Sequence, residues 1–292
     1  MTLPVSPPPI WRSMLFVPAH VDKYVQAAHT RGADAYILDL EDSVPLAQKA
    51  EARHKLKAAV PSVRQSGAAA LVRVNAEEDA LAADLAVAVH ANVAALMIPK
   101  VGSTTALQSI ASTLSILEAE RGLPDGHTRL IAQIEDVHAL ARVDEIAQSS
   151  PRVMGMILGS EDFSVSAGME PTGATLFAPN QQMLFACRRA GILPFGFPGS
   201  ISVFRDLEAF RDTIRLARQM GFVGAYAIHP DQVRVMNEEF LPPADEVAQA
   251  RELIAACAAA EAKGRGAFEF RGRMVDPPVV ARARELIARA GE

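Results

Sequence analysis

The chain has 292 residues, of which 50% are hydrophobic and 22% are charged, and its formal net charge is −5. This composition is ordinary for a globular protein, and the length suits one α/β barrel or two smaller domains. A negatively charged chain without a long Lys/Arg block argues against nucleic acid or an anionic membrane as a partner.

The N-terminus and the two cysteines bear on the compartment. Residues 1–11 are proline-rich and lack a basic segment followed by an apolar one, which predicts an extended arm rather than a signal peptide. No apolar run approaches the length of a membrane span. Cys187 and Cys257 lie in Ala-rich helical contexts without a disulfide framework. Two reduced thiols predict a cytoplasmic protein.

Short apolar runs alternate with segments of helical spacing along residues 12–240. The predicted strands cover residues 14–17, 35–40, 70–74, 95–98, 130–134, 153–158, 192–196 and 225–228. Between them, residues 104–121 show the helical stripe most clearly, with one helix expected in each connection. This alternation predicts a (β/α)8 TIM barrel. A doubly wound sheet is the alternative, but no G-x-G-x-x-G follows any predicted strand.

Residues 241–292 are predicted to form a C-terminal helical extension, or lid. In order, it holds an Ala-rich helix at 245–263, a flexible joint at 264–266, and a hairpin or extended arm at 268–275. Asp276 before Pro277 is suited to cap a last helix. Because the extension is too small to fold alone, we expect it to pack on the barrel or on a neighbouring subunit.

Polar residues gather at the C-terminal ends of the predicted strands, where a barrel carries its chemistry. They are His20, Asp39, Glu41, Asp42, Arg73, Asn75, Lys100, Glu135, Asp136, Ser160, Glu161, Asp162 and His229. Glu135 and Asp162 follow two neighbouring strands, so their carboxylates are expected to converge. Two hard oxygen ligands without His or Cys suit Mg²⁺ better than zinc.

Several of these residues also have structural interpretations. Asp42, Asp136 and Asp162 are each suited to cap a following helix, and His229 to hydrogen-bond to the backbone.

The charged rim residues allow a structural interpretation too. Glu41 is suited to a salt bridge with Lys100 or Arg73. Lys100 could act as a Schiff-base lysine, but the acids around it favour an ion pair.

Eight stretches in order along the chain resemble one known family. They are residues 12–18 (RSMLFVP), 33–44 (ADAYILDLEDSV), 71–75 (LVRVN), 97–101 (MIPKV), 133–135 (QIE), 158–163 (LGSEDF), 221–222 with 227–233 (GF and AIHPDQV) and 272–276 (GRMVD). The sequence is similar here to the citrate lyase β-subunit family of the HpcH/HpaI aldolase superfamily. The resemblance implies a Mg²⁺-dependent barrel enzyme that makes or breaks a carbon–carbon bond beside a carbonyl, usually with an acyl-CoA.

The resemblance also implies roles for individual residues. Glu135 and Asp162 match the metal-ligating acids, and Arg73 matches the arginine that steadies the enolate oxygen. Asp276 matches an acid/base residue that reaches the active site of an adjacent subunit, and Glu41 is expected to be catalytic as well.

The substrate-binding residues implied by the resemblance form a second set. They are Arg73, Phe16, Lys100, Gly159, Ser160 and Glu161. The implied partners are a 2-oxo acid, an acyl-CoA and further copies of the chain, in a trimer or hexamer.

The sequence departs from the family in the parts expected to recognise CoA. Val21 and Ala27 occupy the approximate positions of two basic residues of CoA-using members, and Lys23 replaces them only in part. Residues 196–202 lack the acidic residue common in relatives, and residues 175–183 lack an aromatic-Ala-Arg pattern.

The expected function is therefore a Mg²⁺-dependent carbon–carbon lyase acting on a thioester of the malyl-, citramalyl- or citryl-CoA type. The first alternative is an acyl-CoA thioester hydrolase or an aldolase for free acids. The second, of a different class, is a catalytically silent subunit that binds metabolites.

Overall fold

The computed structural model describes residues 9–262 and 267–290. The chain divides into two compact units between Asn237 and Glu238. The first eight residues of the predicted N-terminal arm lie outside the described residues.

In the described part of the first unit, eight parallel strands form one sheet. They are β1 (Ser13–Pro18), β2 (Ala35–Asp39), β3 (Ala69–Arg73), β4 (Val93–Ile98), β5 (Arg129–Ile134), β6 (Val153–Leu158), β7 (Leu193–Phe195) and β8 (Ala225–Ala227). The strands pair in chain order, and β8 pairs with β1. A parallel bridge between Phe195 and Gly224 brings β7 to the start of β8 and closes the ring. The predicted TIM barrel is confirmed.

The strands form where the sequence is apolar on both faces, as parallel strands covered by helices require. Every residue of β2 and β6 is buried. The last two strands are shorter than the predicted runs at 192–196 and 225–228. At the end of β7, Gly196 has a φ of 131°, which only glycine adopts easily, so the strand stops before it.

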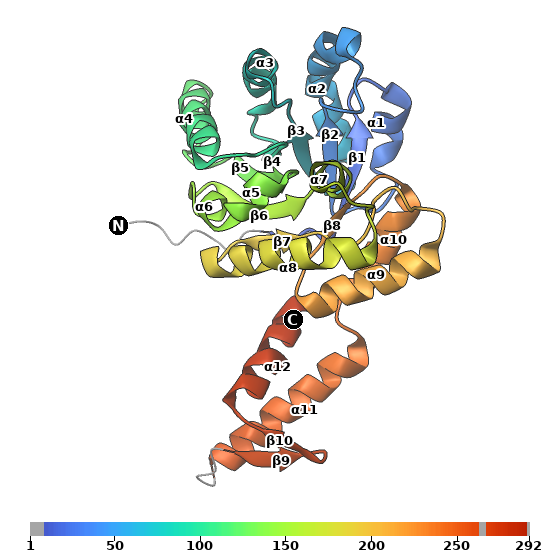
Figure 1. The fold of residues 1–292 in the computed structure, drawn as a ribbon, viewed down its shortest axis with the longest axis vertical. Coiled ribbons are helices and arrows are strands. Elements are labelled where there is room, and N and C mark those ends of the chain that lie inside the picture. The colour runs from blue at the N-terminus through green and yellow to red at the C-terminus, as the bar shows by residue number, and fades with distance from the viewer. Residues whose placement is uncertain (1–8, 263–266, 291–292) are drawn as a thin grey trace. The chain divides into compact units, whose positions relative to one another are not determined.

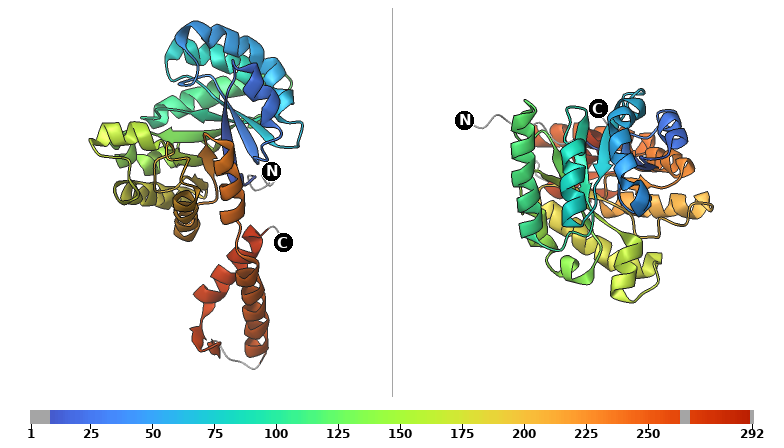
Figure 2. Two further views of the ribbon diagram at one scale, coloured as in Figure 1. Left: turned by 90° about the vertical axis from the view of Figure 1, so that its right-hand side faces the viewer. Right: turned by 90° about the horizontal axis from the view of Figure 1, so that it is seen from above.

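Helices cover the outside of the strands (Figures 1 and 2). They are α1 (Asp22–Ala28), α2 (Lys49–Val63), α3 (Glu78–Ala88), α4 (Thr104–Glu120), α5 (Val137–Ala141), α6 (Val143–Ala147), α7 (Ser160–Ala167), α8 (Gly173–Ala190), α9 (Leu207–Met220) and α10 (Pro230–Glu239). A 3₁₀ helix, η1 (Leu46–Gln48), precedes α2. The single helix predicted between the fifth and sixth strands is wrong. Arg142 leaves helical geometry with φ −112° and ψ 15°, so α5 ends there and α6 begins after it.

The second unit contains α11 (Ala244–Glu261), β9 (Phe268–Phe270), β10 (Arg273–Val275) and α12 (Pro277–Arg289). The two strands pair antiparallel, so residues 268–275 form the hairpin rather than the extended arm. The predicted joint at 264–266 lies outside the described residues. A small core of Cys257, Val275 and Val280 packs against Leu253, Phe268, Phe270 and Val279.

Both cysteines are free, as the sequence predicts, and both are buried. Within residues 9–262 and 267–290, no helix combines the length and the apolar character that crossing a membrane demands.

Candidate active site

The C-terminal ends of the barrel strands surround a pocket of about 420 Å³. Its lining consists of Phe16, Pro18, Asp39, Asp42, Ser43, Arg73, Gln133, Gly159, Ser160, Glu161, Asp162, Ile201, Tyr226 and Ile228. Six predicted site residues are therefore in the lining: Phe16, Arg73, Gly159, Ser160, Glu161 and Asp162. Three others, Glu41, Lys100 and Glu135, contact the lining residues Arg73, Asp42 and Gln133 in turn.

Arg73, at the end of β3, is held in one orientation. Its Nε and Nη2 donate to the two oxygens of Asp39 at 2.7 and 2.8 Å. Its guanidinium carbon lies 4.6 Å from the centre of the Phe16 ring. Burial alone would lower the pKa of Arg73, but the hydrogen bonds and charge of Asp39 raise it well above its ordinary value. The site therefore presents a permanent, fixed cation.

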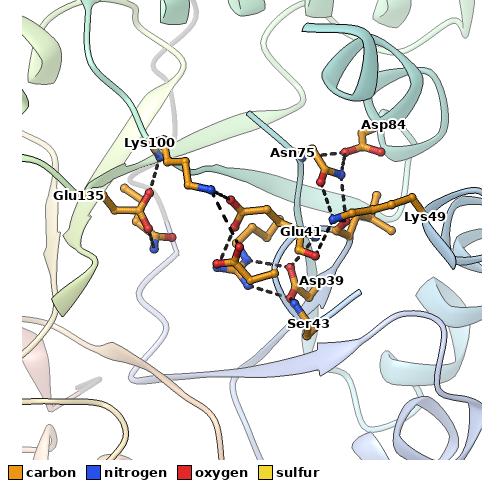
Figure 3. A network of polar contacts seen from close by, with 12 residues as sticks. Asp39, Glu41, Ser43, Lys49, Asn75, Asp84, Lys100 and Glu135 are labelled. Atoms are coloured by element: carbon orange, nitrogen blue, oxygen red, sulfur yellow. Dashed lines mark hydrogen bonds and ion pairs between the residues drawn. The ribbon is translucent and has the colours of Figure 1, made fainter. Parts of the chain in front are cut away.

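Glu41, in the loop after β2, joins Arg73 to Lys100. Its Oε2 lies 3.0 Å from Nη1 of Arg73, and its Oε1 lies 2.8 Å from Nζ of Lys100 (Figure 3). The predicted salt bridge forms with both partners. The hydrogen bond to Glu41 is the main cause that raises the pKa of Lys100. Lys100 is thus a protonated ion-pair partner, which disfavours the Schiff-base interpretation.

Asp42 lies beside the same cations instead of capping a helix. Its carboxylate is 3.4 Å from Arg73 and 4.0 Å from Lys100. The helix cap predicted for Asp42 is wrong, because a 3₁₀ helix beginning at Leu46 follows the loop. The cap predicted for Asp136 is confirmed, since its Oδ1 accepts from the backbone of His138 and Ala139 at 2.8 Å.

Glu135, after β5, is buried among other acids. Its Oε2 accepts from the backbone N–H of Lys100 at 2.5 Å, and its Oε1 accepts from Nε2 of Gln133 at 2.7 Å. Burial raises the pKa of Glu135 to about 8, and the charges of Glu41 and Asp162 act in the same direction. This carboxylate is therefore short of positive charge.

Gly159 and the start of α7 complete this side of the pocket. A Cβ on Gly159 would lie 2.6 Å from Cγ of Glu135, so only glycine leaves room for that side chain. Asp162 is the third residue of α7, so its predicted role as a helix cap is wrong. Gly159 has no side chain to cap this helix, and within the described chain no hydrogen bond is found for the backbone N–H groups of Glu161 and Asp162 in its first turn.

The acids on this side fit a hard cation. Among the described residues, no group of three His, Cys, Asp or Glu side chains has metal-site geometry. Glu135 and Asp162 instead supply two carboxylates, and Gln133 Oε1 is a buried oxygen without a hydrogen-bond partner in the described chain. Mg²⁺ is commonly bound by one or two carboxylates, with water and substrate oxygens in its remaining positions.

The other predicted residues lie elsewhere. Asp276 belongs to the second unit, where its Oδ1 accepts from the backbone of Val279 at 3.2 Å and caps α12 as predicted. Nδ1 of His229 accepts from the backbone of Asp231 at 3.3 Å, which confirms its predicted structural role.

The structure adds residues that the sequence did not single out for the site. The sequence shows Asp39 as an acid at a strand end, but it does not show the bidentate hydrogen bonding of Asp39 to Arg73. Tyr226 packs its ring edge-on to Phe16 at 5.3 Å, and its hydroxyl donates to Leu158 O at 3.0 Å. No signal marked Tyr226, because it sits in an apolar strand like any core residue.

Two known lyases are similar in sequence to this chain over almost its whole length. The L-malyl-CoA/beta-methylmalyl-CoA lyase of Cereibacter sphaeroides is 34% identical over 318 residues, which cover 100% of this chain and 99% of that protein. The citrate lyase subunit beta of Leuconostoc mesenteroides subsp. cremoris is 33% identical over 282 residues, covering 94% of this chain and 92% of that one.

A solved structure and a family model give the same result. The crystal structure of CitE from Mycobacterium tuberculosis in complex with magnesium, acetoacetate and coenzyme A has a TM-score of 0.76 at 28% identity. That match covers 98% of this chain and 99% of CitE. The model for HpcH/HpaI aldolase/citrate lyase matches residues 12–230. The chain therefore belongs to the HpcH/HpaI aldolase/citrate lyase family.

Proposed function

We propose that this chain is a Mg²⁺-dependent carbon–carbon lyase that separates or joins a 2-oxo acid and an acyl-CoA. Its substrate would be a 3-hydroxy-acid thioester of the malyl-, citramalyl- or citryl-CoA type. The observation that carries the proposal is the arrangement around one pocket of two carboxylates, the buried Glu135 and the pocket-lining Asp162, with the fixed guanidinium of Arg73.

Glu135 and Asp162 would hold the metal. When bound, Mg²⁺ supplies a Lewis acid for the keto oxygen of the 2-oxo acid. The free N–H groups of Glu161 and Asp162 at the start of α7 suit the carboxylate of the same acid, and Ser160, the first residue of this helix, lines the same pocket.

Arg73 serves the other half of the substrate. In the cleavage direction, the bond between the hydroxyl-bearing carbon and the thioester α-carbon breaks. Its electron pair moves onto the thioester, and an enolate oxygen develops beside Arg73. Because Asp39 and Phe16 already fix the guanidinium, little reorganisation is needed as this charge forms. Glu41 forms an ion pair with each of Arg73 and Lys100 and so fixes the positions of these two cations relative to one another.

The α-carbon then needs a proton, and the 3-hydroxyl must lose one. We assign the acid/base role to Asp276 of an adjacent subunit, on the family resemblance of residues 272–276. Its carboxylate is exposed at the start of α12. This assignment needs a homo-oligomer in which each site takes residues from two chains. The oligomer that we propose is a trimer or hexamer. The free cysteines support a reducing, cytoplasmic setting.

The test is thermal stabilisation by Mg²⁺ and a panel of 2-oxo acids, each with and without acetyl-CoA. Binding to the folded state raises its stability by mass action, so the panel ranks the ligands. We expect the largest shift when all three are present, and loss of the Mg²⁺ shift in Glu135→Ala and Asp162→Ala. Full turnover in both variants, or in the presence of a chelator, would contradict the proposal.

A second candidate is favoured by Val21 and Ala27, which stand where CoA-using relatives have basic residues. It is a thioester hydrolase or an aldolase for free acids. A product assay separates the candidates, because a lyase releases acetyl-CoA or another acyl-CoA and a hydrolase releases free CoA. Binding of Mg²⁺ and 2-oxo acid without turnover on any substrate would indicate a silent metabolite-binding subunit.

A further inference from the structure

Lys49, the first residue of α2, directs its ammonium group at the loop that follows β2. Nζ donates to Leu40 O at 2.8 Å, to Glu41 O at 2.6 Å and to Asn75 Oδ1 at 2.6 Å (Figure 3). An ammonium group has three donors, so all of them are used. Two of the three acceptors are main-chain carbonyls of the loop that carries Glu41.

Asn75 is oriented by a second group of contacts. Its Nδ2 donates to Leu40 O at 2.9 Å and to Asp84 Oδ2 at 2.6 Å, and its backbone N–H donates to the same Asp84 oxygen at 2.7 Å. Asp84, fully buried in α3, also accepts from Nε of Arg53 at 2.6 Å. The amide oxygen of Asn75 therefore has to face Lys49.

The loop that Lys49 holds is the one that holds Arg73. Glu41 and Asp42 contact Nη1 of Arg73 at 3.0 and 3.4 Å. From the other side, Asp39 accepts from the backbone N–H groups of Glu41 and Ser43, each at 3.0 Å. The loop is thus fixed through its carbonyls by Lys49 and through its amides by Asp39.

Burial of this network is costly, because a Lys and an Asp give up water. A network whose only task was to anchor α2 and α3 could end on those helices. This one continues to the backbone at Glu41, and Lys49 itself is not in the pocket lining.

We propose that Lys49 is a positioning residue for Arg73. By fixing the carbonyls of Leu40 and Glu41, it sets the loop so that its two acids hold the guanidinium where the enolate oxygen forms. The inference rests on the proposed lyase function, and it assigns Lys49 no contact with substrate.

The experiment compares Lys49→Met and Lys49→Arg with a matched control, Lys57→Met, in the full-length protein. Lys57 lies exposed on the same helix, and no hydrogen bond or ion pair of Lys57 is found within the described chain. For each variant, kcat, KM, the Mg²⁺ dissociation constant and Tm are measured. Tm identifies any variant that fails to fold.

We expect kcat of Lys49→Met to fall by about 100-fold, the size of loss that a misplacement of about 1 Å causes. KM and the Mg²⁺ dissociation constant should stay within about twofold of wild type, because Glu135 and Asp162 are not held by this loop. Lys49→Arg keeps the charge, but its planar fork fits three divergent acceptors poorly, so kcat should fall with the fold intact. Lys57→Met should match wild type.

A folded Lys49→Met or Lys49→Arg variant with wild-type kcat overturns the inference while the proposed function stands. A loss of Tm with parallel losses of kcat and Mg²⁺ affinity also overturns it, because that result marks a purely structural role. If the wild-type protein neither makes nor breaks a carbon–carbon bond with any 2-oxo acid and acyl-CoA tested, the proposed function is refuted, and the role of Lys49 is refuted with it.

Discussion

Glu135 and Gly159 lie so close that no side chain fits at position 159. A Cβ there would be 2.6 Å from Cγ of Glu135, 2.8 Å from its Oε1 and 2.9 Å from Nε2 of Gln133. Gly159, directly after β6, thus leaves the space that the side chain of Glu135, directly after β5, occupies. The absence of a side chain at position 159 is therefore a condition for the observed position of the Glu135 carboxylate.

Gly159→Ala should therefore weaken Mg²⁺ binding although it replaces neither of the two proposed metal ligands. The added methyl group must displace Glu135, and disturbing the support of a ligand commonly costs about 10- to 100-fold in metal affinity. The measurement is the Mg²⁺-dependent shift in Tm. Gly102→Ala is the matched control, since nothing lies within 4 Å of a Cβ there. Equal Mg²⁺ affinity in the two variants would refute the steric argument.

Arg73→Lys should lower kcat by about 100-fold or more, as loss of a donor to a developing oxyanion does. Lysine keeps the charge but cannot reproduce the two parallel bonds to Asp39, so the cation loses its fixed position. Steady-state kinetics at saturating substrate measure the effect. Arg129→Lys, at the opposite end of the barrel strands, should leave kcat unchanged. The Mg²⁺ shift in Tm should persist in both variants.

Mixing two inactive variants tests whether Asp276 acts across subunits. Arg73→Ala and Asp276→Ala should each be inactive alone. After joint unfolding and reassembly at equal amounts, about a quarter of sites would combine both wild-type residues, if every site is shared between neighbouring chains. Activity is assayed before and after reassembly, with each variant reassembled alone as the control. No recovery from the mixture would place Asp276 outside the neighbour's site.

The strand starts offer a prediction about pH and stability. Arg152 contacts both oxygens of the buried Glu118, at 2.7 and 2.8 Å. Burial alone would raise the pKa of Glu118, but the hydrogen bonds from Arg152 and from the backbone of Thr128 and Gly126 lower it below 4.5. The stabilisation is therefore complete above pH 4.5 and is lost as pH falls through the lower, folded-state pKa.

Glu118→Gln should lower the free energy of unfolding at pH 7 by about 3 kcal/mol, since it leaves a buried cation without its main partner. The gap to wild type should start to narrow as pH falls below 4.5 and narrow most as pH passes the lower, folded-state pKa, where wild-type Glu118 also becomes neutral. Urea unfolding at pH 7 and at a series of lower pH values measures this gap. Glu145→Gln, from an exposed pair with Arg142, should cost about 0.5 kcal/mol or less. A gap that does not change with pH would show that charge is not the cause.

The barrel was predictable because its signal is local. Each strand is an apolar run short enough to be distinguished from a helix, and β6 has the predicted bounds of residues 153–158. The ends of β7 and the break at Arg142 were not predictable, because they depend on single backbone angles. The site's acids were visible for the same local reason, since they follow strands.

The contacts that orient the site were not visible in the sequence. Asp84 sits in the Ala-rich α3, and nothing in that pattern marks it as the partner of Asn75. Gln133 looked like one polar residue in an apolar strand, although it faces Glu135. Such pairs are set by which strands and helices become neighbours, and this information appears only after the barrel closes.

Lys100 contacts the two halves of the site with different parts of itself. Its main-chain N–H donates a hydrogen bond to Glu135, and its side-chain ammonium group forms an ion pair with Glu41. Its φ of 52° is a left-handed value that costs lysine energy and glycine very little. Replacement by glycine would keep the amide contact and delete the ion pair. A change at this one position would therefore alter the contacts of Glu41 while leaving the backbone contact to Glu135, the proposed metal ligand.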